Sequence, residues 1–166
     1  MHRREGRATI AGMTLPSLFA DTPEHRILLE EYLDLDSDEV RLEWLMERPM
    51  LHHQVPEDLR TAALRVPGCL SGLWLHTELR EGKSFFASYS DSAMVQGITS
   101  FLCDLHSGRS PEEILSINLE LARLLGLERL LSMNRKRAVL SVMNYILAQA
   151  RHHLATLHPA TASEAV

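Results

Sequence analysis

The chain has 166 residues, of which 45% are hydrophobic, and its formal net charge is −5. This size fits one domain with an ordinary core, and the negative charge gives no reason to expect binding to nucleic acid. Two cysteines are too few for a disulfide framework, which favours a reducing, cytoplasmic location, and no apolar run reaches the roughly 18 residues that a membrane span requires.

The N-terminal segment differs from the rest of the chain. The run His2–Arg7 is basic, and a mildly apolar stretch to Ala20 follows it. Polar residues, Gly and Pro interrupt that stretch, so it makes a poor secretory signal, and Met13 is a second candidate for the start of translation. We expect a flexible lead over residues 1–20, one domain over 21–157 and a flexible tail over 158–166.

Two helices are expected at the start of the domain. Thr22 and Pro23 have the residue types of an N-cap and a first helical residue, which predicts a helix to about Leu33. Ser37 begins a second helix, which Pro49 ends.

A strand region follows. Apolar and polar residues alternate over 73–80, which predicts a half-buried strand. Residues 81–83 form a turn, and the return strand runs from Ser84 to Ser88 or Tyr89. Residues 64–66 are a candidate third strand.

The second half is helical. Ser90-Asp91 caps the helix with the clearest apolar face, which Gly108 ends. Ser110–Glu113 is a capping box, residues 119–125 form a short helix, and the last helix begins near Asn134. Helices before and after an antiparallel meander predict an α+β domain, with helices packed on one face of a small sheet of about three strands.

Cys69 is the most informative single residue. Pro67-Gly68 precedes it and Ser71-Gly72 follows it, which predicts a loop just before the strand at Leu73. A loop thiol is open to a partner. The alternative is a small buried side chain, as in most free cysteines.

A cluster of cations stands at the start of the last helix. Arg135, Lys136 and Arg137 lie where the helix macrodipole disfavours positive charge. A positive patch beside a thiol would lower its pKa and favour the thiolate. The alternative is that these side chains are simply solvated.

A metal site is a competing hypothesis. Cys103 and His106 are spaced to share a helix face, and Cys-x-x-His is half of a zinc site. The remaining ligands would be Cys69 and Asp91. Packing of Cys103 in the core is the alternative that we favour.

Four blocks in this order resemble the SufE family, the sulfur-acceptor proteins of iron–sulfur cluster biogenesis. The family's Gly-Cys-Gln-Ser-Gln-Val-Trp resembles Gly68–Trp74, and its Ser-Asp-Ala-Ala-Ile-Val-Lys-Gly resembles Ser90–Gly97. Its Thr-Pro-Glu-Glu-Ile resembles Ser110–Ile114, and its Leu-Thr/Ser-Pro-Ser-Arg resembles Leu131–Arg135. The similarity spans about residues 25–155, and its order and spacing make it specific.

The resemblance implies a fold, a function and partners. Family members share the α+β fold of SufE and IscU and carry no cofactor of their own. They dock on a pyridoxal-phosphate cysteine desulfurase of the SufS type and stimulate it. Their cysteine takes up a sulfane sulfur as a persulfide and passes it to a scaffold of the SufB/C/D type. The matching blocks imply that Cys69 is the sulfur acceptor of this chain. They also imply that Asp91 and Arg135 match polar positions near the cysteine loop and the partner surface.

Such a protein is an accessory to sulfur transfer rather than an enzyme in its own right. Two alternatives stay open: an IscU-like scaffold that binds a metal or a cluster through Cys69, Asp91, Cys103 and His106, or a regulatory partner that binds the desulfurase without taking its sulfur. A homodimer is also compatible with the sequence.

The chain departs from the family at several positions. Leu70 and Gly72 stand where the family has glutamines, Gln96 stands where it has lysine, and Met133-Asn134 replaces Pro-Ser. The lost glutamines leave open which polar groups hold the cysteine loop.

Overall fold

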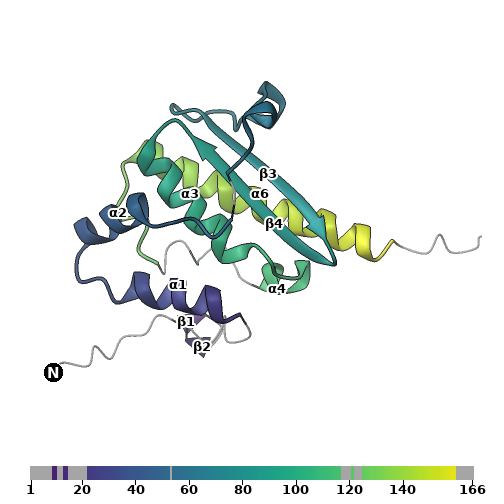
Figure 1. Cartoon of the computed structure of the whole chain (residues 1–166), viewed down its shortest axis with the longest axis horizontal. Coiled ribbons are helices and arrows are strands. Elements are labelled where there is room, and N and C mark those ends of the chain that lie inside the picture. Colours follow the sequence, from purple (N-terminus) through teal and green to yellow (C-terminus); the bar gives the residue numbers. More distant parts are fainter. Residues whose placement is uncertain are drawn as a thin grey trace, which may run out of the picture.

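The fold is built around a long β-hairpin and two helices that pack against it (Figure 1). The computed structural model describes residues 9–10, 13–14, 22–52, 54–116, 121 and 125–159. The hairpin consists of β3 (Leu73–Arg80) and β4 (Lys83–Ser90), and the two helices are α3 (Ala93–His106) and α6 (Met133–Leu157). This arrangement confirms the predicted α+β class.

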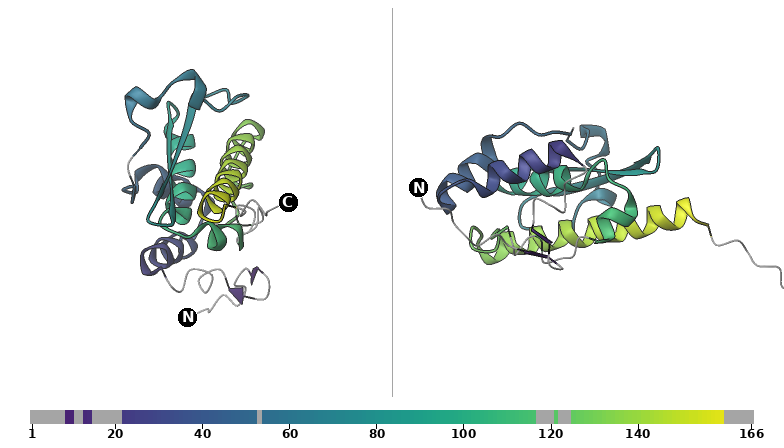
Figure 2. Two further views of the ribbon diagram at one scale, coloured as in Figure 1. Left: turned by 90° about the vertical axis from the view of Figure 1, so that its right-hand side faces the viewer. Right: turned by 90° about the horizontal axis from the view of Figure 1, so that it is seen from below.

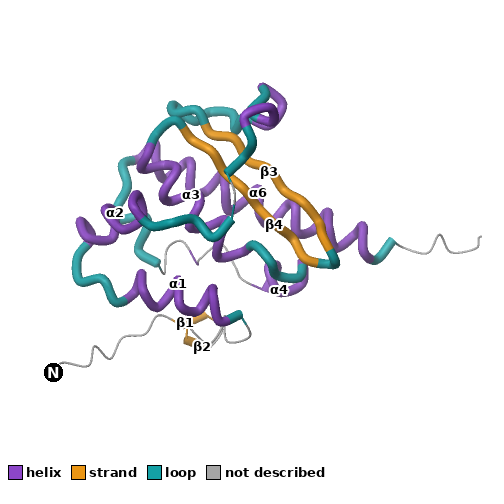
Figure 3. Tube along the Cα trace, in the orientation of Figure 1, coloured by secondary structure: helices purple, strands orange, loops and turns teal. Residues whose placement is uncertain are grey.

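The hairpin has a regular antiparallel register, and its two strands run side by side in Figure 3. Leu73 pairs with Ser90 at the open end, and Arg80 pairs with Lys83 at the turn. The turn residues Glu81 and Gly82 have φ of 50° and 76°. Positive φ at both positions is the twist that joins two strands through a two-residue turn.

One face of the hairpin is buried against the helices. Leu73, Leu75 and Phe86 belong to the core. Serines on β4 fill the other inward positions: the Ser88 hydroxyl accepts a hydrogen bond from Thr99 of α3 at 2.9 Å. The predicted alternation of inward and outward side chains is therefore confirmed.

The predicted third strand is not formed. Residues 64–66 make one antiparallel bridge, between Arg65 and Trp74. Pro67 has no N–H to continue the ladder, and Gly68, with φ of 78°, turns the chain away. The sheet that contains β3 therefore has two strands rather than about three.

The helices α1 (Pro23–Leu33) and α2 (Asp38–Glu47) begin where the sequence predicts. The Ser37 side chain caps α2 by accepting a backbone N–H at 3.2 Å. Thr22 does not cap α1 with its side chain. Its hydroxyl instead accepts a hydrogen bond from Arg109 at 3.0 Å, which ties the start of α1 to the chain after α3.

Aromatic packing holds α1 and α2 on α3. The rings of Tyr32 and Trp44 lie 5.0 and 5.7 Å from that of Phe101, centroid to centroid. A Cβ at Gly97 would overlap the backbone carbonyl of Leu45. Glycine therefore allows α2 to cross α3 closely.

The segments outside this core are short. The capping box confirms the start of α4 (Pro111–Ser116): the Ser110 N–H donates to Glu113 at 2.8 Å, and the Glu113 N–H donates to Ser110 at 3.2 Å. The predicted helix over 119–125 lies mostly outside the described residues. So does the predicted lead, apart from β1 (Thr9–Ile10) paired with β2 (Met13–Thr14), and so does the predicted tail beyond residue 159.

Two single-turn helices, η2 (Glu57–Leu59) and η3 (Ala62–Leu64), precede the hairpin. None of the described helices combines the length and the apolar character that a membrane crossing requires.

Because His106 is buried, we expect the free energy of unfolding to fall in acid. Its side chain is fully buried, and burial lowers its pKa from 6.5 to about 4. Between these values the unfolded chain binds a proton that the folded chain excludes, so stability falls as the pH falls. From about pH 7.5 to pH 4 we expect this residue alone to cost about 3 kcal/mol. Urea unfolding at several pH values measures this loss. The free energy of unfolding of His106→Leu should depend less steeply on pH than that of the wild type. Equal dependence on pH would contradict a lowered pKa for His106.

Candidate functional site

The loop that carries Cys69 lies at the open end of the hairpin. The N-termini of α3 and α6 lie at this same end (Figures 1 and 2). Cys69 is half-buried and packs against the core. The next side chain, Leu70, is 82% exposed. The thiol is therefore sheltered by a loop whose outer surface faces solvent.

A set of three hydrogen bonds, called here the Gly72 clasp, closes the end of this loop. The Gly72 N–H donates to the Asp91 carboxylate at 3.0 Å. The Gly72 carbonyl accepts from the Ser90 hydroxyl at 2.7 Å and from the Asp91 N–H at 3.3 Å. Both polar backbone groups of Gly72 are thus used, and the loop is fixed to the start of α3.

This arrangement corrects the prediction that Asp91 is the N-cap of α3. The cap is Ser92, whose hydroxyl accepts the Val95 N–H at 3.4 Å. The Asp91 carboxylate is turned back to Gly72 instead. Asp91 therefore holds the cysteine loop rather than the helix.

Trp74 covers the clasp from the outer face of the hairpin. A Cβ at position 72 would lie 2.6 Å from the Trp74 ring and 2.7 Å from the Asp91 carboxylate. The indole N–H donates to the Thr61 carbonyl at 3.1 Å, which fixes the ring. Only a residue without a Cβ fits this close arrangement. The N–H and the carbonyl of Gly72 supply polar contacts that hold the loop.

Burial controls the acidity of Cys69. Loss of water raises the pKa of its thiol, and the charge of Arg65 partly opposes the rise. The hypothesis that the cations of the last helix lower this pKa is therefore not supported, because the opposing charge is that of Arg65. At neutral pH the thiol is mainly protonated, which makes it a weak nucleophile until the loop opens or an anion-stabilising group approaches.

Arg135 lies in the first turn of α6, together with Lys136 and Arg137. This turn contains no acidic residue, and Ser132 does not cap it with its side chain. The groups that set the pKa of Cys69 include Arg65 but not Arg135. The cations of α6 thus belong to the same end of the molecule as the thiol, without governing its acidity.

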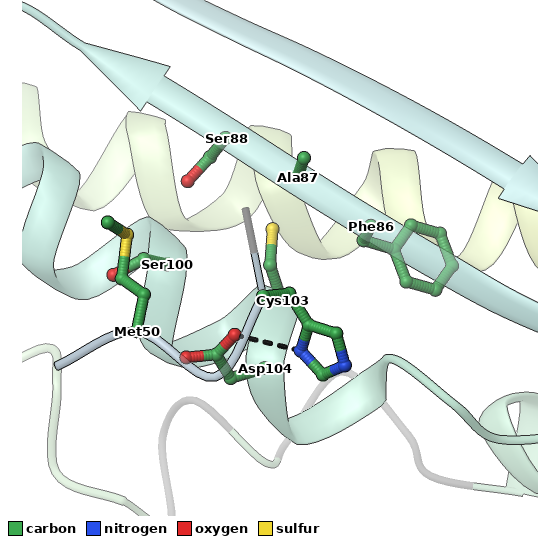
Figure 4. A pocket seen from close by; sticks show the side chains of 8 residues that line it. Met50, Phe86, Ala87, Ser88, Ser100, Cys103 and Asp104 are labelled. Atoms are coloured by element: carbon green, nitrogen blue, oxygen red, sulfur yellow. Dashed lines mark hydrogen bonds and ion pairs between the residues drawn. The ribbon is translucent and has the colours of Figure 1, made fainter. Parts of the chain in front are cut away.

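Cys103 has a different environment. It is 3% exposed, and burial strongly raises the pKa of its thiol. Figure 4 shows its sulfur directed toward β4, beside a cavity of about 10 Å³ that Ser88 and Asp104 help to line. A space of this size holds no ligand larger than water. Packing of Cys103 in the core is therefore confirmed.

The residues of the predicted metal site are not brought together. His106 is buried, and its Nδ1 lies 2.7 Å from the Leu102 carbonyl. Within the described part of the chain, no three His, Cys, Asp or Glu side chains form a group that could hold a metal ion. Cys69, Asp91, Cys103 and His106 thus do not make a four-ligand centre in this structure.

A sequence profile of a known family matches most of the described domain. The profile is that of "SufE: Fe-S metabolism associated domain", and it covers residues 26–150. The chain belongs to the SufE family.

Curated relatives agree with membership of the SufE family. A cysteine desulfuration protein SufE of Plasmodium vivax is 36% identical over 98 residues, which is 57% of this chain and 38% of that protein. A chloroplastic quinolinate synthase of Arabidopsis thaliana is 35% identical over 94 residues, or 56% of this chain and 13% of that protein. The chain therefore matches only a part of each of these two relatives.

Two other proteins match over most of their length. An uncharacterised SufE-like protein of Rhizobium meliloti is 27% identical over 132 residues, which is 76% of this chain and 94% of that protein. A solution structure of a hypothetical protein from Thermus thermophilus has a TM-score of 0.60 at 23% identity, and covers 80% of this chain and 97% of that one. At this identity, the likeness to the solved structure shows a shared fold alone.

Some contacts around the SufE-family cysteine were not identifiable from the sequence. Ser90 and Arg65 are ordinary strand and loop residues in the printed chain, and their contacts depend on how the loop folds back. The sequence placed Ser90 in a helix cap and at the start of a family block, but neither signal predicts that its hydroxyl donates to the Gly72 carbonyl.

Removal of the Asp91 carboxylate tests the Gly72 clasp. We expect Asp91→Ala to lower the free energy of unfolding by about 1 kcal/mol, because the Gly72 N–H loses its acceptor. Hydrogen exchange of that N–H should also become faster. Asp91→Asn retains a carbonyl acceptor and is the matched control. If exchange at Gly72 is the same in Asp91→Ala and the wild type, the clasp does not hold the loop in solution.

Proposed function

We propose that Cys69 accepts a sulfane sulfur from a cysteine desulfurase of the SufS type, that docking stimulates the desulfurase, and that the sulfur then passes to an iron–sulfur scaffold of the SufB/C/D type. Membership of the SufE family supports the role of sulfur acceptor. The observation that carries the choice of residue is the contrast between the two thiols: Cys69 is half-buried in a surface loop, whereas Cys103 is enclosed by the core.

The transfer conserves both bonds and electrons. The Cys69 thiolate attacks the outer sulfur of the persulfide on the desulfurase. The bond between that sulfur and the donor cysteine breaks, and its electron pair stays on the donor as a thiolate. One sulfur–sulfur bond replaces another, so no oxidant is consumed. The donor takes up a proton in place of the one that Cys69 lost.

The surroundings of Cys69 suit a carrier of reactive sulfur. Burial keeps the resting thiol protonated and limits its access to oxidants. Arg65 provides a positive charge for the anionic thiolate or persulfide. The Gly72 clasp is the part that must loosen if the sulfur is to reach a second protein, because it fixes the loop beside α3. Arg135 meets the partner surface rather than the thiol.

The cellular setting follows from the same proposal. Both cysteines are free, which agrees with a reducing compartment such as the cytoplasm. A SufE-like relative of Arabidopsis thaliana is named chloroplastic/mitochondrial, so an organelle interior is the other setting to test.

Sulfur loading can be measured directly. The protein is incubated with the cysteine desulfurase of its own organism and cysteine, and its intact mass is recorded without reductant. We expect a gain of one sulfur, about 32 Da, which peptide mapping assigns to Cys69. Cys103→Ser should gain the same mass, because its thiol is buried.

Variants of the two cysteines distinguish a sulfur acceptor from a regulatory partner of the desulfurase. Cys69→Ser should gain no sulfur. If it stimulates the desulfurase as well as the wild type does, and the wild type gains no sulfur, the protein is a regulatory partner and not an acceptor. A gain on Cys103 would contradict the assignment of the site.

A further inference from the structure

The surface around the Cys69 loop has a distinct composition. Leu70 is 82% exposed and Met133, the first residue of α6, is 73% exposed. They have the largest exposed fractions among the exposed large hydrophobic residues of the described chain. Their two segments lie at the same end of the molecule (Figures 1 and 2). Leu70 adjoins the thiol in the chain, and highly exposed apolar side chains at the same end of the molecule are candidate contacts for a partner.

Several cations lie near these two side chains. Arg135, Lys136 and Arg137 follow Met133 closely, and the first turn of α6 has no acidic residue to offset them. Arg65 is close enough to Cys69 to act on its pKa. The helix macrodipole adds to the positive potential at this end. The whole chain carries −5, so a cluster of cations beside the cysteine loop runs against the net charge of the protein.

We infer that Leu70 and Met133 are apolar anchors for the desulfurase, and that they fit an apolar depression with carboxylates at its rim beside the donor cysteine. This inference rests on the proposed function. Complementary charge orients the approach and raises the association rate, while the buried apolar contacts hold the complex. The surface of Leu70, Met133, Arg135, Lys136 and Arg137 is called here the docking face.

The position of Leu70 explains how docking and transfer are coupled. It adjoins Cys69 in a loop whose far end the Gly72 clasp holds. Insertion of Leu70 into a depression pulls on the residue that carries the thiol. Docking at this side chain therefore places Cys69 at the donor, whereas contact elsewhere on the domain would not.

The test measures docking separately from reactivity. Sulfur loading of Cys69 by the desulfurase is followed at increasing concentrations of Leu70→Ser, and of the double variant Lys136→Glu, Arg137→Glu. We expect the half-saturating concentration to rise about tenfold in each, with a maximal rate within about twofold of the wild type. Higher salt should weaken docking of the wild type more than that of the double variant.

Matched controls remove general effects of the substitutions. Ile27→Ser removes a side chain that is 51% exposed on α1. The first turn of α1 contacts the C-terminal end of α3, away from the cysteine loop at its N-terminal end. Arg151→Glu reverses an exposed charge near the far end of α6. Both should load like the wild type. Inorganic polysulfide, which needs no docking, should load Cys69 equally in every variant.

The outcomes distinguish this inference from the function on which it rests. If the desulfurase loads the wild type and Leu70→Ser with equal half-saturating concentrations, the docking face is wrong and the acceptor role stands. If Leu70→Ser is also loaded more slowly by polysulfide, Leu70 acts on the thiol and not on docking. If the desulfurase does not load the wild type at all, the proposed function itself fails.

Discussion

The position of Cys69 depends on the hydrogen bonds of Gly72. Its N–H and carbonyl are both bound by residues at the junction of β4 and α3. This junction is itself fixed, because α3 packs on the inner face of the hairpin. The core therefore determines where the cysteine loop ends, and the loop determines how far the thiol is shielded.

Shielding, rather than charge, sets the resting state of the thiol. Burial and Arg65 act on the pKa of Cys69 in opposite directions, and burial has the larger effect. An acceptor with a permanently lowered pKa would be exposed to every oxidant in its compartment. Under the proposed function, a thiol that is protonated at rest becomes nucleophilic only when docking changes its environment. The same effect is larger for Cys103, because its burial in the core strongly raises the pKa of its thiol.

The hairpin, the long helices and the capping box follow from local patterns, and the sequence predicted them. Alternation over 73–80 and the residue types Ser110 to Glu113 require no knowledge of the remainder of the chain. The family blocks also singled out Cys69 as the candidate acceptor, which stays a prediction. What local patterns could not predict was the direction in which the chain leaves residues 64–66, because that depends on Gly68 taking a positive φ.

The same limit applies to the details of the site. Asp91 has the residue type of an N-cap, and only the folded loop shows that its carboxylate binds the Gly72 N–H instead. The pKa of Cys69 is raised because the thiol is partly buried, and no sequence pattern predicts that burial. Leu70 and Gly72 interrupt the family motif, but in the structure Leu70 faces solvent and Gly72 lies under the Trp74 ring.

The most direct test of this account is the rate at which each thiol of the folded protein reacts with iodoacetamide as the pH is raised. An unstructured peptide with the sequence around Cys69 provides the reference. The account predicts that Cys69 titrates at a higher pH than the peptide, and that Cys103 stays unmodified until the protein unfolds. A midpoint for Cys69 at or below that of the peptide, or equal reaction of Cys103, would contradict it.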